Sequence, residues 1–366
     1  MALRGWSWEA AVGPEGVRDR PLLEALQTVL PDEVVERAIE ATATREQRRR
    51  LLPTHMVVTL VVAMGLWAGE SMRHALAAVV DGWRERDAAA EEHWHLPCTA
   101  ALVRARKRVG VRLLRVLFHS VAGPIATPQT PGAFLNGLRL MALDGTTLEV
   151  ADTSANERAF GRPSTPRGTS AYPQVRLVEM IRATQARGAD FLGRAKVNLI
   201  FEPTEILADG SFLAAVYRTP YDRLRRVGGH PVRIIEYALD TPEQVGRERY
   251  RLVTSLLDER AFPAKQLAAV YHERWEIETT LDEVKVHQWA HPKPLRSQAP
   301  REVVQEIYGL LLAHLAIRTM MHQAALRQGL DPDRLSFTGA LRVLRRAIGR
   351  AQRTSPELLP LFLSAC

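Results

Sequence analysis

Four side chains that can bind phosphate or a metal ion are spaced along one segment of helical character. They are Tyr271, Arg274, Glu278 and Lys285. On a helix with about 100° per residue they fall at roughly 0°, 300°, 340° and 320°, within an arc of about 60°. Asp282 falls at about 20° and joins them. This narrow stripe suits a site that holds a metal ion and grips phosphate. The alternative is a solvated charged face, the commoner origin of mixed charge runs.

The composition describes a basic chain with ample apolar content. Its 366 residues are 46% hydrophobic and carry a formal net charge of +8, and the length suggests two or three domains. The pI of about 9.8 favours a polyanionic partner. Cys98 and Cys366 are too far apart for a disulfide framework and fit a reducing cytoplasm. The apolar run 56–68 is shorter than the roughly 20 residues that span a bilayer, so we expect a buried helix and no membrane span.

Residues 21–123 are predicted to be helical. Apolar positions recur at helical spacing over 21–30 and 32–41, with a start signal at Pro31 and Asp32 between them. Residues 54–69 indicate a buried helix, and 70–86 an amphipathic one.

A further helix, with Thr99 as its expected N-cap, carries five cations within an arc of about 140°. They are Arg104, Lys107, Arg108, Arg112 and Arg115. Gly110 leaves a single helix and a helix-turn-helix both open. The basic face is either laid against DNA phosphates or simply solvated, and the sequence leaves both open.

The rest of the chain alternates strands, loops and helices. Residues 122–137 are rich in Pro, Gly and Thr and indicate a linker. A strand is expected around 138–152, a surface loop over 154–173, a short strand over 174–180 and a helix-like stretch over 181–189. Strands are also predicted at 232–239 and 250–257. A long apolar helix is expected over 303–326, and the last helix carries a second basic stripe of Arg342, Arg345, Arg346, Arg350 and Arg353.

Several segments carry a family resemblance in a fixed order. The stripe of Tyr271 to Lys285 reads Tyr-x2-Arg-x3-Glu-x6-Lys. The others are LPTHMVVTLVVAMGLW (52–67), LDGTT (143–147), DTSANERAFG (152–161), YPQVRLVE (172–179), LRSQAP (295–300) and LLLAHLAIR (310–318). Together they resemble the DDE transposases of the insertion-sequence-4 family over roughly residues 20–350.

The resemblance implies a ribonuclease-H-like core in which two Asp and one Glu bind two divalent metals for strand cleavage and joining. It makes Asp144 the first carboxylate and Glu278 the third, with Mg2+ or Mn2+ as the ion. Arg274 and Lys285 would clamp phosphates of the element end. Tyr271 would orient or stack near the scissile end. On the residues alone, Asp144 could also be a turn carboxylate before the following glycine.

The implied partner is double-stranded DNA at the terminal inverted repeats of the chain's own element, bound by a possible homodimer in a synaptic complex. DNA contacts are expected from both basic stripes, at Arg104, Lys107, Arg108, Arg342, Arg345 and Arg346. The implied location is the bacterial cytoplasm, beside the nucleoid.

The expected fold class is α/β, with a helical N-terminal domain and a truncated ribonuclease-H-like core. The expected boundaries are 1–123 for the helical domain, 124–137 for the linker, 138–325 for the core and 326–366 for a basic helical segment. The core would contain a β-rich insertion at about 197–257.

One part of the family pattern is missing. The Asp-Arg-Gly-Phe segment that would carry the second catalytic Asp is absent, and the resemblance implies that the chain is shortened around Met180. Asp190 and Asp209 are the nearest downstream acids, but neither matches that position. Without this carboxylate the two-metal site cannot assemble in the family's manner, so we expect a catalytically defective transposase. The alternatives are a DNA-binding remnant that inhibits transposition, another metal nuclease, or a scaffold without catalysis.

Overall fold

The computed structural model describes residues 30–48, 50–84, 96–141, 145–165, 168–172, 174–178, 189–195, 199–217, 220–239, 248–273, 280–289 and 294–349. The chain divides into two compact units. Unit 1 comprises Met1–Ala133, Thr146–Leu177 and Thr280–Cys366, and unit 2 comprises Phe134–Gly145 and Val178–Thr279. Helix and strand are both present, as the sequence predicted.

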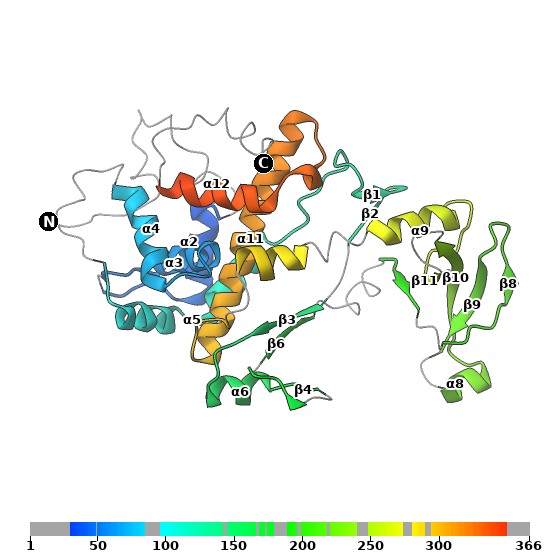
Figure 1. The fold of residues 1–366 in the computed structure, drawn as a ribbon, viewed down its shortest axis with the longest axis horizontal. Helices are drawn as coiled ribbons and strands as arrows, with labels where there is room; N and C mark the ends of the chain where they lie inside the picture. The colour runs from blue at the N-terminus through cyan, green and yellow to red at the C-terminus, as the bar shows by residue number, and fades with distance from the viewer. Residues whose placement is uncertain are drawn as a thin grey trace. The chain divides into compact units, whose positions relative to one another are not determined.

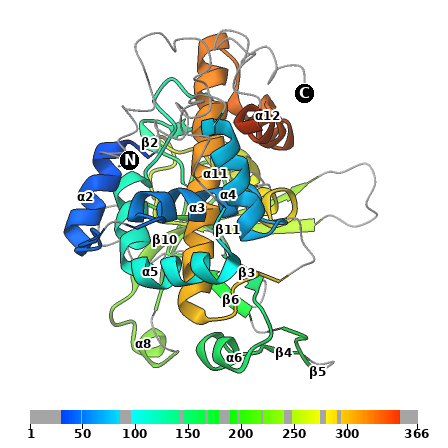
Figure 2. The same ribbon diagram turned by 90° about the vertical axis from the view of Figure 1, so that its left-hand side faces the viewer.

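Unit 1 is built around the helix α11 (Pro300–Gln328), against which α3 (Thr54–Leu66) and α5 (Thr99–Val121) pack (Figure 2). The helices α2 (Asp32–Thr42), α4 (Met72–Arg84) and α12 (Phe337–Gly349) complete the bundle, and a short 3-10 helix, η4 (Pro332–Arg334), precedes α12. The apolar faces of these helices form one continuous core. The predicted buried helix at 54–69 and the long apolar helix at 303–326 are therefore confirmed as α3 and α11.

Helix boundaries follow local sequence signals in part. Helix α2 begins directly after Pro31 with Asp32 and Glu33 in its first turn, where acidic side chains favour the positive end of the helix dipole. The expected N-cap at Thr99 is wrong by one residue, because Cys98 has the extended cap conformation and α5 begins at Thr99. Gly110 has φ 71° and ψ −175°, so α5 is kinked there, and a glycine adopts this conformation without steric cost.

The strands of unit 1 form a short ribbon. Strand β3 (Gly145–Glu149) pairs with β6 (Gln174–Val178), which confirms the short strand predicted at 174–180. The surface loop predicted for 154–173 is wrong, because this stretch forms α6 (Ser154–Phe160) and the hairpin of β4 (Ser164–Thr165) with β5 (Gly168–Thr169). The side chain of Thr153 caps α6 by accepting a hydrogen bond from the Asn156 amide at 3.1 Å.

Unit 2 is an antiparallel sheet in the order β7-β11-β10-β9-β8 (Figure 1). Its strands are β7 (Leu192–Arg194), β8 (Glu205–Ile206), β9 (Phe212–Val216), β10 (His230–Leu239) and β11 (Glu248–Thr254). The strands predicted at 232–239 and 250–257 are thus present as β10 and β11. The short helix α8 (Pro220–Arg225) joins β9 to β10.

Helix α9 (Ala264–Glu273) packs on one face of this sheet through Leu267 and Tyr271, which belong to one apolar cluster with Ile235 and Leu252. The opposite face has its own small apolar cluster around Ile234. A separate hairpin of β1 (Phe134–Leu135) with β2 (Leu138–Arg139) occupies the end of the predicted linker and the start of the strand expected at 138–152.

Several predicted segments lie outside the described residues. These are 21–29 and the helix-like stretch of residues 181–188. Among the helices that the structure describes, each is too short or too polar to cross a membrane.

Candidate functional site

The structure describes only part of the stripe from Tyr271 to Lys285. Tyr271 lies on α9 in unit 2 and is 8% exposed. Lys285 is half-buried in unit 1, on a π-helix, η3 (Glu283–Gln288). Arg274, Glu278 and Asp144 lie outside the described residues. The expectation of uniform α-helical spacing is wrong at Lys285, because a π-helix closes its hydrogen bonds from i to i+5 and winds more slowly than an α-helix.

The turn that carries Lys285 is anchored at its first residue by a buried ion pair. Glu283 Oε2 accepts hydrogen bonds from Arg318 Nε at 2.8 Å and, when the ring nitrogen is protonated, from His314 Nε2 at 3.0 Å. Glu283 is only 4% exposed, so its charge depends on these partners for compensation. Both partners lie on α11, which fixes the start of η3 to the central helix of unit 1.

The same turn is anchored at its last residue by a buried amide. Gln288 Nε2 donates to the carbonyl oxygen of Gly65 at 3.2 Å and to that of Leu310 at 2.8 Å. These acceptors belong to α3 and α11, near the point where the two helices cross. The backbone of Lys285 is therefore held at both sides by hydrogen bonds to a rigid helix pair.

Strand β3, which begins directly after Asp144, lies beside the segment that follows η3. The Leu295 amide donates to the Glu149 carbonyl at 2.8 Å, and Val150 forms a parallel bridge with Leu295. Val150 also packs in one apolar cluster with Trp289. Strand β3 and the segment that directly follows η3 thus belong to the same core.

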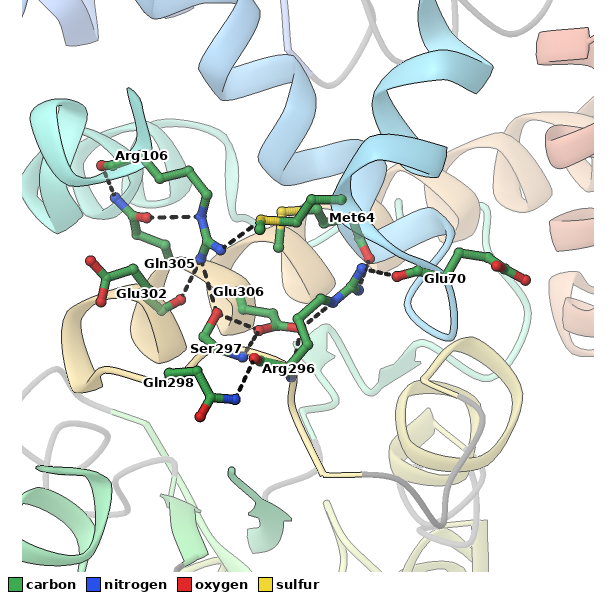
Figure 3. Close-up of polar contacts among 10 residues, drawn as sticks. Met64, Glu70, Arg106, Arg296, Ser297, Gln298, Glu302, Gln305 and Glu306 are labelled. Atoms are coloured by element: carbon green, nitrogen blue, oxygen red, sulfur yellow. Dashed lines mark hydrogen bonds and ion pairs between the residues drawn. The ribbon is translucent and has the colours of Figure 1, made fainter. Parts of the chain in front are cut away.

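A buried polar network holds residues 295–298, in the segment that follows η3, to the N-terminal helices (Figure 3). Arg106 of α5 is 1% exposed. Its Nε donates to Gln305 Oε1 at 3.2 Å, and its Nη2 donates to Ser297 Oγ at 3.2 Å and to the Glu302 carbonyl at 2.6 Å. Burial lowers the pKa of the Arg106 guanidinium, and the nearby Glu306 charge opposes that shift.

Glu306 of α11 completes the network on the other side of Ser297. Its carboxylate accepts from Ser297 Oγ at 2.6 Å and from Arg296 Nε at 2.7 Å. Arg296 Nη2 in turn donates to the Met64 carbonyl of α3 at 2.8 Å. Figure 3 shows Arg106 reaching Ser297, and Arg296 of the same segment extending toward the carbonyl oxygens of Met64 and Glu70.

The same segment is also fixed to the region after β3. Asn156 Nδ2 donates to the Ser297 carbonyl at 3.2 Å, and Thr153 Oγ1 donates to the Gln298 carbonyl at 3.0 Å. Residues 295–298 therefore form a joint between β3, α6 and the helices α3, α5 and α11. Sequence reasoning matched LRSQAP only as a resemblance and missed this structural role.

Comparison with known proteins identifies the family. The family profile "Insertion element 4 transposase N-terminal" matches residues 20–119, and "Transposase DDE domain" matches residues 136–316. The chain belongs to the insertion-sequence-4 family of DDE transposases. It is 26% identical over 390 residues to "Transposase InsG for insertion sequence element IS4" of Escherichia coli (strain K12), covering 92% of this chain and 86% of that protein.

A second relative matches a smaller part. The chain is 29% identical over 153 residues to "Putative transposase InsZ" of Escherichia coli (strain K12), covering 42% of this chain and 48% of that protein. DDE domains as a class use divalent metal ions. Among the residues that the structure describes, none of the His, Cys, Asp and Glu side chains gather in threes in a way that could hold one. The expected ligands Asp144 and Glu278 are outside that part of the chain.

The acids nearest to the missing second Asp are engaged elsewhere. Asp209 Oδ2 accepts from the Ala264 amide at 2.8 Å and pairs with Arg233, whose side chain is fully buried. Burial acts to raise the pKa of Asp209. Hydrogen bonds from Ser211 and Ala264, together with the charge of Arg233, outweigh this effect, so that the pKa is lowered. Asp190 Oδ1 accepts from Ser255 Oγ at 2.8 Å. Both carboxylates thus have partners within unit 2.

The two basic stripes differ in how freely their cations face solvent. On α5 the predicted cations Arg104, Lys107, Arg108, Arg112 and Arg115 are all exposed, although Arg108 also donates to the Leu52 carbonyl. On α12, Arg342 is exposed, whereas Arg345 is half-buried and its Nε donates to the Leu66 carbonyl at 2.7 Å. Burial lowers the pKa of Arg345. The side chain of Arg346, and Arg350 and Arg353 entirely, lie outside the described part.

Proposed function

We propose that this chain binds the ends of its own insertion element and carries the remains of a metal-dependent site for strand cleavage and transfer. The observation that carries the proposal is the pairing of Glu149 with Leu295, which joins the strand after Asp144 to the segment after Lys285. The surrounding core would be ribonuclease-H-like, with the sheet of unit 2 as the β-rich insertion at about 197–257 and a basic helical segment from 326.

The proposed roles follow from the chemistry of phosphodiester attack. Water is deprotonated and attacks the phosphorus at the element end, which releases a 3′-hydroxyl. That hydroxyl then attacks a phosphodiester of the target, forming one bond and breaking another. Arg274 and Lys285 would neutralise the phosphates, and Tyr271 would stack near the scissile end. Asp144 and Glu278 would be the metal ligands.

The donor chemistry of this site fits a hard divalent ion only in part. Asp144 and Glu278 supply carboxylate oxygens, which suit Mg2+ or Mn2+. A bound ion would stabilise negative charge on the reacting oxygens. The second carboxylate of the family pattern is missing, and Asp190 and Asp209 are held by other partners. We therefore infer that cleavage is defective in this chain.

The length of the alignment supports an internal loss. The match to the InsG transposase extends over 390 positions, more than the 366 residues of this chain, so that relative has residues without a counterpart here. The sequence pattern locates such a loss near Met180.

DNA would bind through the exposed cations of α5 and α12. The five exposed cations of α5 lie on both sides of the kink at Gly110 and can contact phosphates, which gives affinity without reading sequence. Because two element ends must be joined, a homodimer in a synaptic complex is the expected assembly. The cytoplasm beside the nucleoid is the location that this partner requires.

The first experiment is Mg2+- or Mn2+-dependent nicking of a supercoiled plasmid that carries the element's own ends, with a gel shift on the same ends. We expect end-specific binding without nicking. The control is the Glu278→Gln variant, which should bind equally well. Nicking by the unaltered chain that Glu278→Gln abolishes would show that another acid replaces the missing Asp and would refute the defect.

The second candidate is a DNA-binding remnant that inhibits transposition, and the engagement of Asp190 and Asp209 favours it. Such a chain would occupy element ends or form mixed oligomers with an intact relative. Adding it to an active transposase of the same element should lower strand transfer in proportion to end occupancy. Unchanged transfer at saturating occupancy would exclude this role.

A further inference from the structure

The short helix α8 and the turn after it form an exposed feature of unit 2, here named the α8 tip (residues 220–230). Leu224 is 83% exposed, Val227 62% and Tyr221 57%. Leu224 is the most exposed large apolar side chain in the part of the chain that the structure describes. Such a concentration of apolar side chains in water is costly unless a partner covers them.

The α8 tip is also strongly basic. Residues 220–230 contain three arginines and one aspartate. Arg223 Nη2 donates to Glu202 Oε1 at 2.9 Å, and this hydrogen bond lowers the pKa of Glu202. The Arg225 guanidinium lies 4.3 Å from the centroid of the Tyr221 ring, which gives an exposed stacked pair of planar groups. The three arginines of the α8 tip outnumber its one aspartate even when Glu202 is counted with the acids.

The backbone holds the tip in a defined shape. The Arg226 amide donates to the Arg223 carbonyl at 3.1 Å, and Arg226 adopts a left-handed φ of 54°. Directly after the turn, His230 pairs with Val216 at the end of the β9–β10 ladder. The apolar and basic side chains are therefore presented by a turn that is fastened to the sheet.

We propose that the α8 tip is a separate contact surface for duplex DNA, in which Arg225 and Arg226 bind phosphates and Leu224 and Val227 pack against the walls of the minor groove. Apolar side chains flanked by arginines are the combination that such contacts use. The positive charge argues for a polyanion over a protein partner. The proposal rests on the DNA binding proposed above, and adds a contact remote in sequence from Asp144, Glu278 and both basic stripes.

The test measures the salt dependence of binding to a labelled duplex that carries an element end, by fluorescence anisotropy with the full chain. The double variant Arg225→Gln and Arg226→Gln should make the slope of log affinity against log salt shallower by about 1.8, because two phosphate contacts are lost. The matched control is Arg260→Gln, which removes an exposed cation elsewhere in unit 2 and should leave the slope unchanged.

The apolar contact is tested with Leu224→Ser. This change should weaken binding about tenfold at every salt concentration without changing the slope, because it removes buried apolar area and no charge. Since Leu224 is exposed in the free chain, its replacement leaves folding intact, which circular dichroism verifies. An unchanged slope in the arginine variant, or an unchanged affinity in Leu224→Ser, overturns the proposal.

Two further results separate this proposal from the function on which it rests. If Arg104→Gln and Lys107→Gln weaken DNA binding while the tip variants do not, the proposed function stands and the tip contact fails. If the unaltered chain binds no DNA, both fail. If the tip variants change only self-association in sedimentation, the surface contacts a second copy of the chain and the DNA assignment is wrong.

Discussion

The Leu295 amide donates a 2.8 Å hydrogen bond to the Glu149 carbonyl, and this bond joins the strand after Asp144 to the joint at residues 295–298. Ser297 in that joint is held by Arg106 on one side and Glu306 on the other. Movement of the joint would therefore displace the end of β3, at Glu149, relative to α3, α5 and α11. The N-terminal helices α3 and α5 therefore hold the joint in place, in addition to the DNA binding proposed for α5.

Replacement of Arg106 by Ala should destabilise unit 1 by about 3 kcal/mol. The change leaves Gln305 Oε1 and the Glu302 carbonyl without their buried donor and creates a cavity. The measurement is urea unfolding followed by the fluorescence of buried Trp67. Lys107→Ala is the control, because this neighbour is exposed and should cost less than about 0.5 kcal/mol. Equal losses in the two variants would contradict the network's role.

A second prediction concerns the crossing of α3 and α11. A Cβ atom added to Gly309 would collide with the Val61 carbonyl oxygen, and one added to Gly65 would collide with the Gly309 carbonyl. Gly309→Ala should therefore force the helices apart and cost about 1–3 kcal/mol, despite the higher helix propensity of alanine. Thermal unfolding measures the loss. Gly123→Ala meets no atom within 4 Å and should not destabilise, so a similar loss there would refute the packing argument.

The long-range pattern of helices was predictable because each helix carries its own burial signal. The apolar run of α3 is buried on almost every side, and α11 supplies the continuous face that packs on it. Helix α6 was missed, although Thr153 is a favoured capping residue and could have marked its start. Seven residues of mixed polarity give too weak a periodicity to separate a helix from a loop.

The geometry of the proposed site was less predictable, because distant residues impose it. The π-helical turn at Lys285 depends on Glu283 and Gln288 reaching α3 and α11, and no local sequence rule encodes those contacts. Arg106 shows the same limit. Arg106 lies on the buried side of α5, together with Leu102 and Val109. A cation is tolerated there because polar groups of α11 and of the joint accept its hydrogen bonds.

A third prediction concerns pH. His322 on α11 is 8% exposed, its Nε2 lies 2.9 Å from Thr130 Oγ1, and burial lowers its pKa from 6.5. The folded state therefore binds a proton less readily than the unfolded state. The contribution of neutral His322 to the free energy of unfolding is therefore fully present above pH 6.5, and it declines as the pH falls through and below that value. Unfolding in urea at about pH 7.5 and about pH 5.5 should show the loss.

The variant His322→Gln isolates this contribution. Glutamine does not titrate and can still bond to Thr130, so the variant should lose less stability on acidification than the unaltered chain. His74→Gln serves as the control for replacing a histidine, because His74 is exposed on α4 and not buried on α11. An identical acid loss in the unaltered chain and in His322→Gln would remove His322 as its source.

The last prediction separates two arginines of α12 that the sequence placed in one DNA-binding stripe. Arg342 is exposed, whereas Arg345 Nε donates to the Leu66 carbonyl at the end of α3. Arg342→Gln should make the salt slope of DNA binding shallower by about 0.9 and leave stability unchanged. Arg345→Gln should cost about 1 kcal/mol of stability and leave the slope unchanged, since a buried carbonyl loses its donor. If both variants change the slope equally, Arg345 reaches DNA despite its bond to Leu66, and α12 contacts the duplex along its whole basic face.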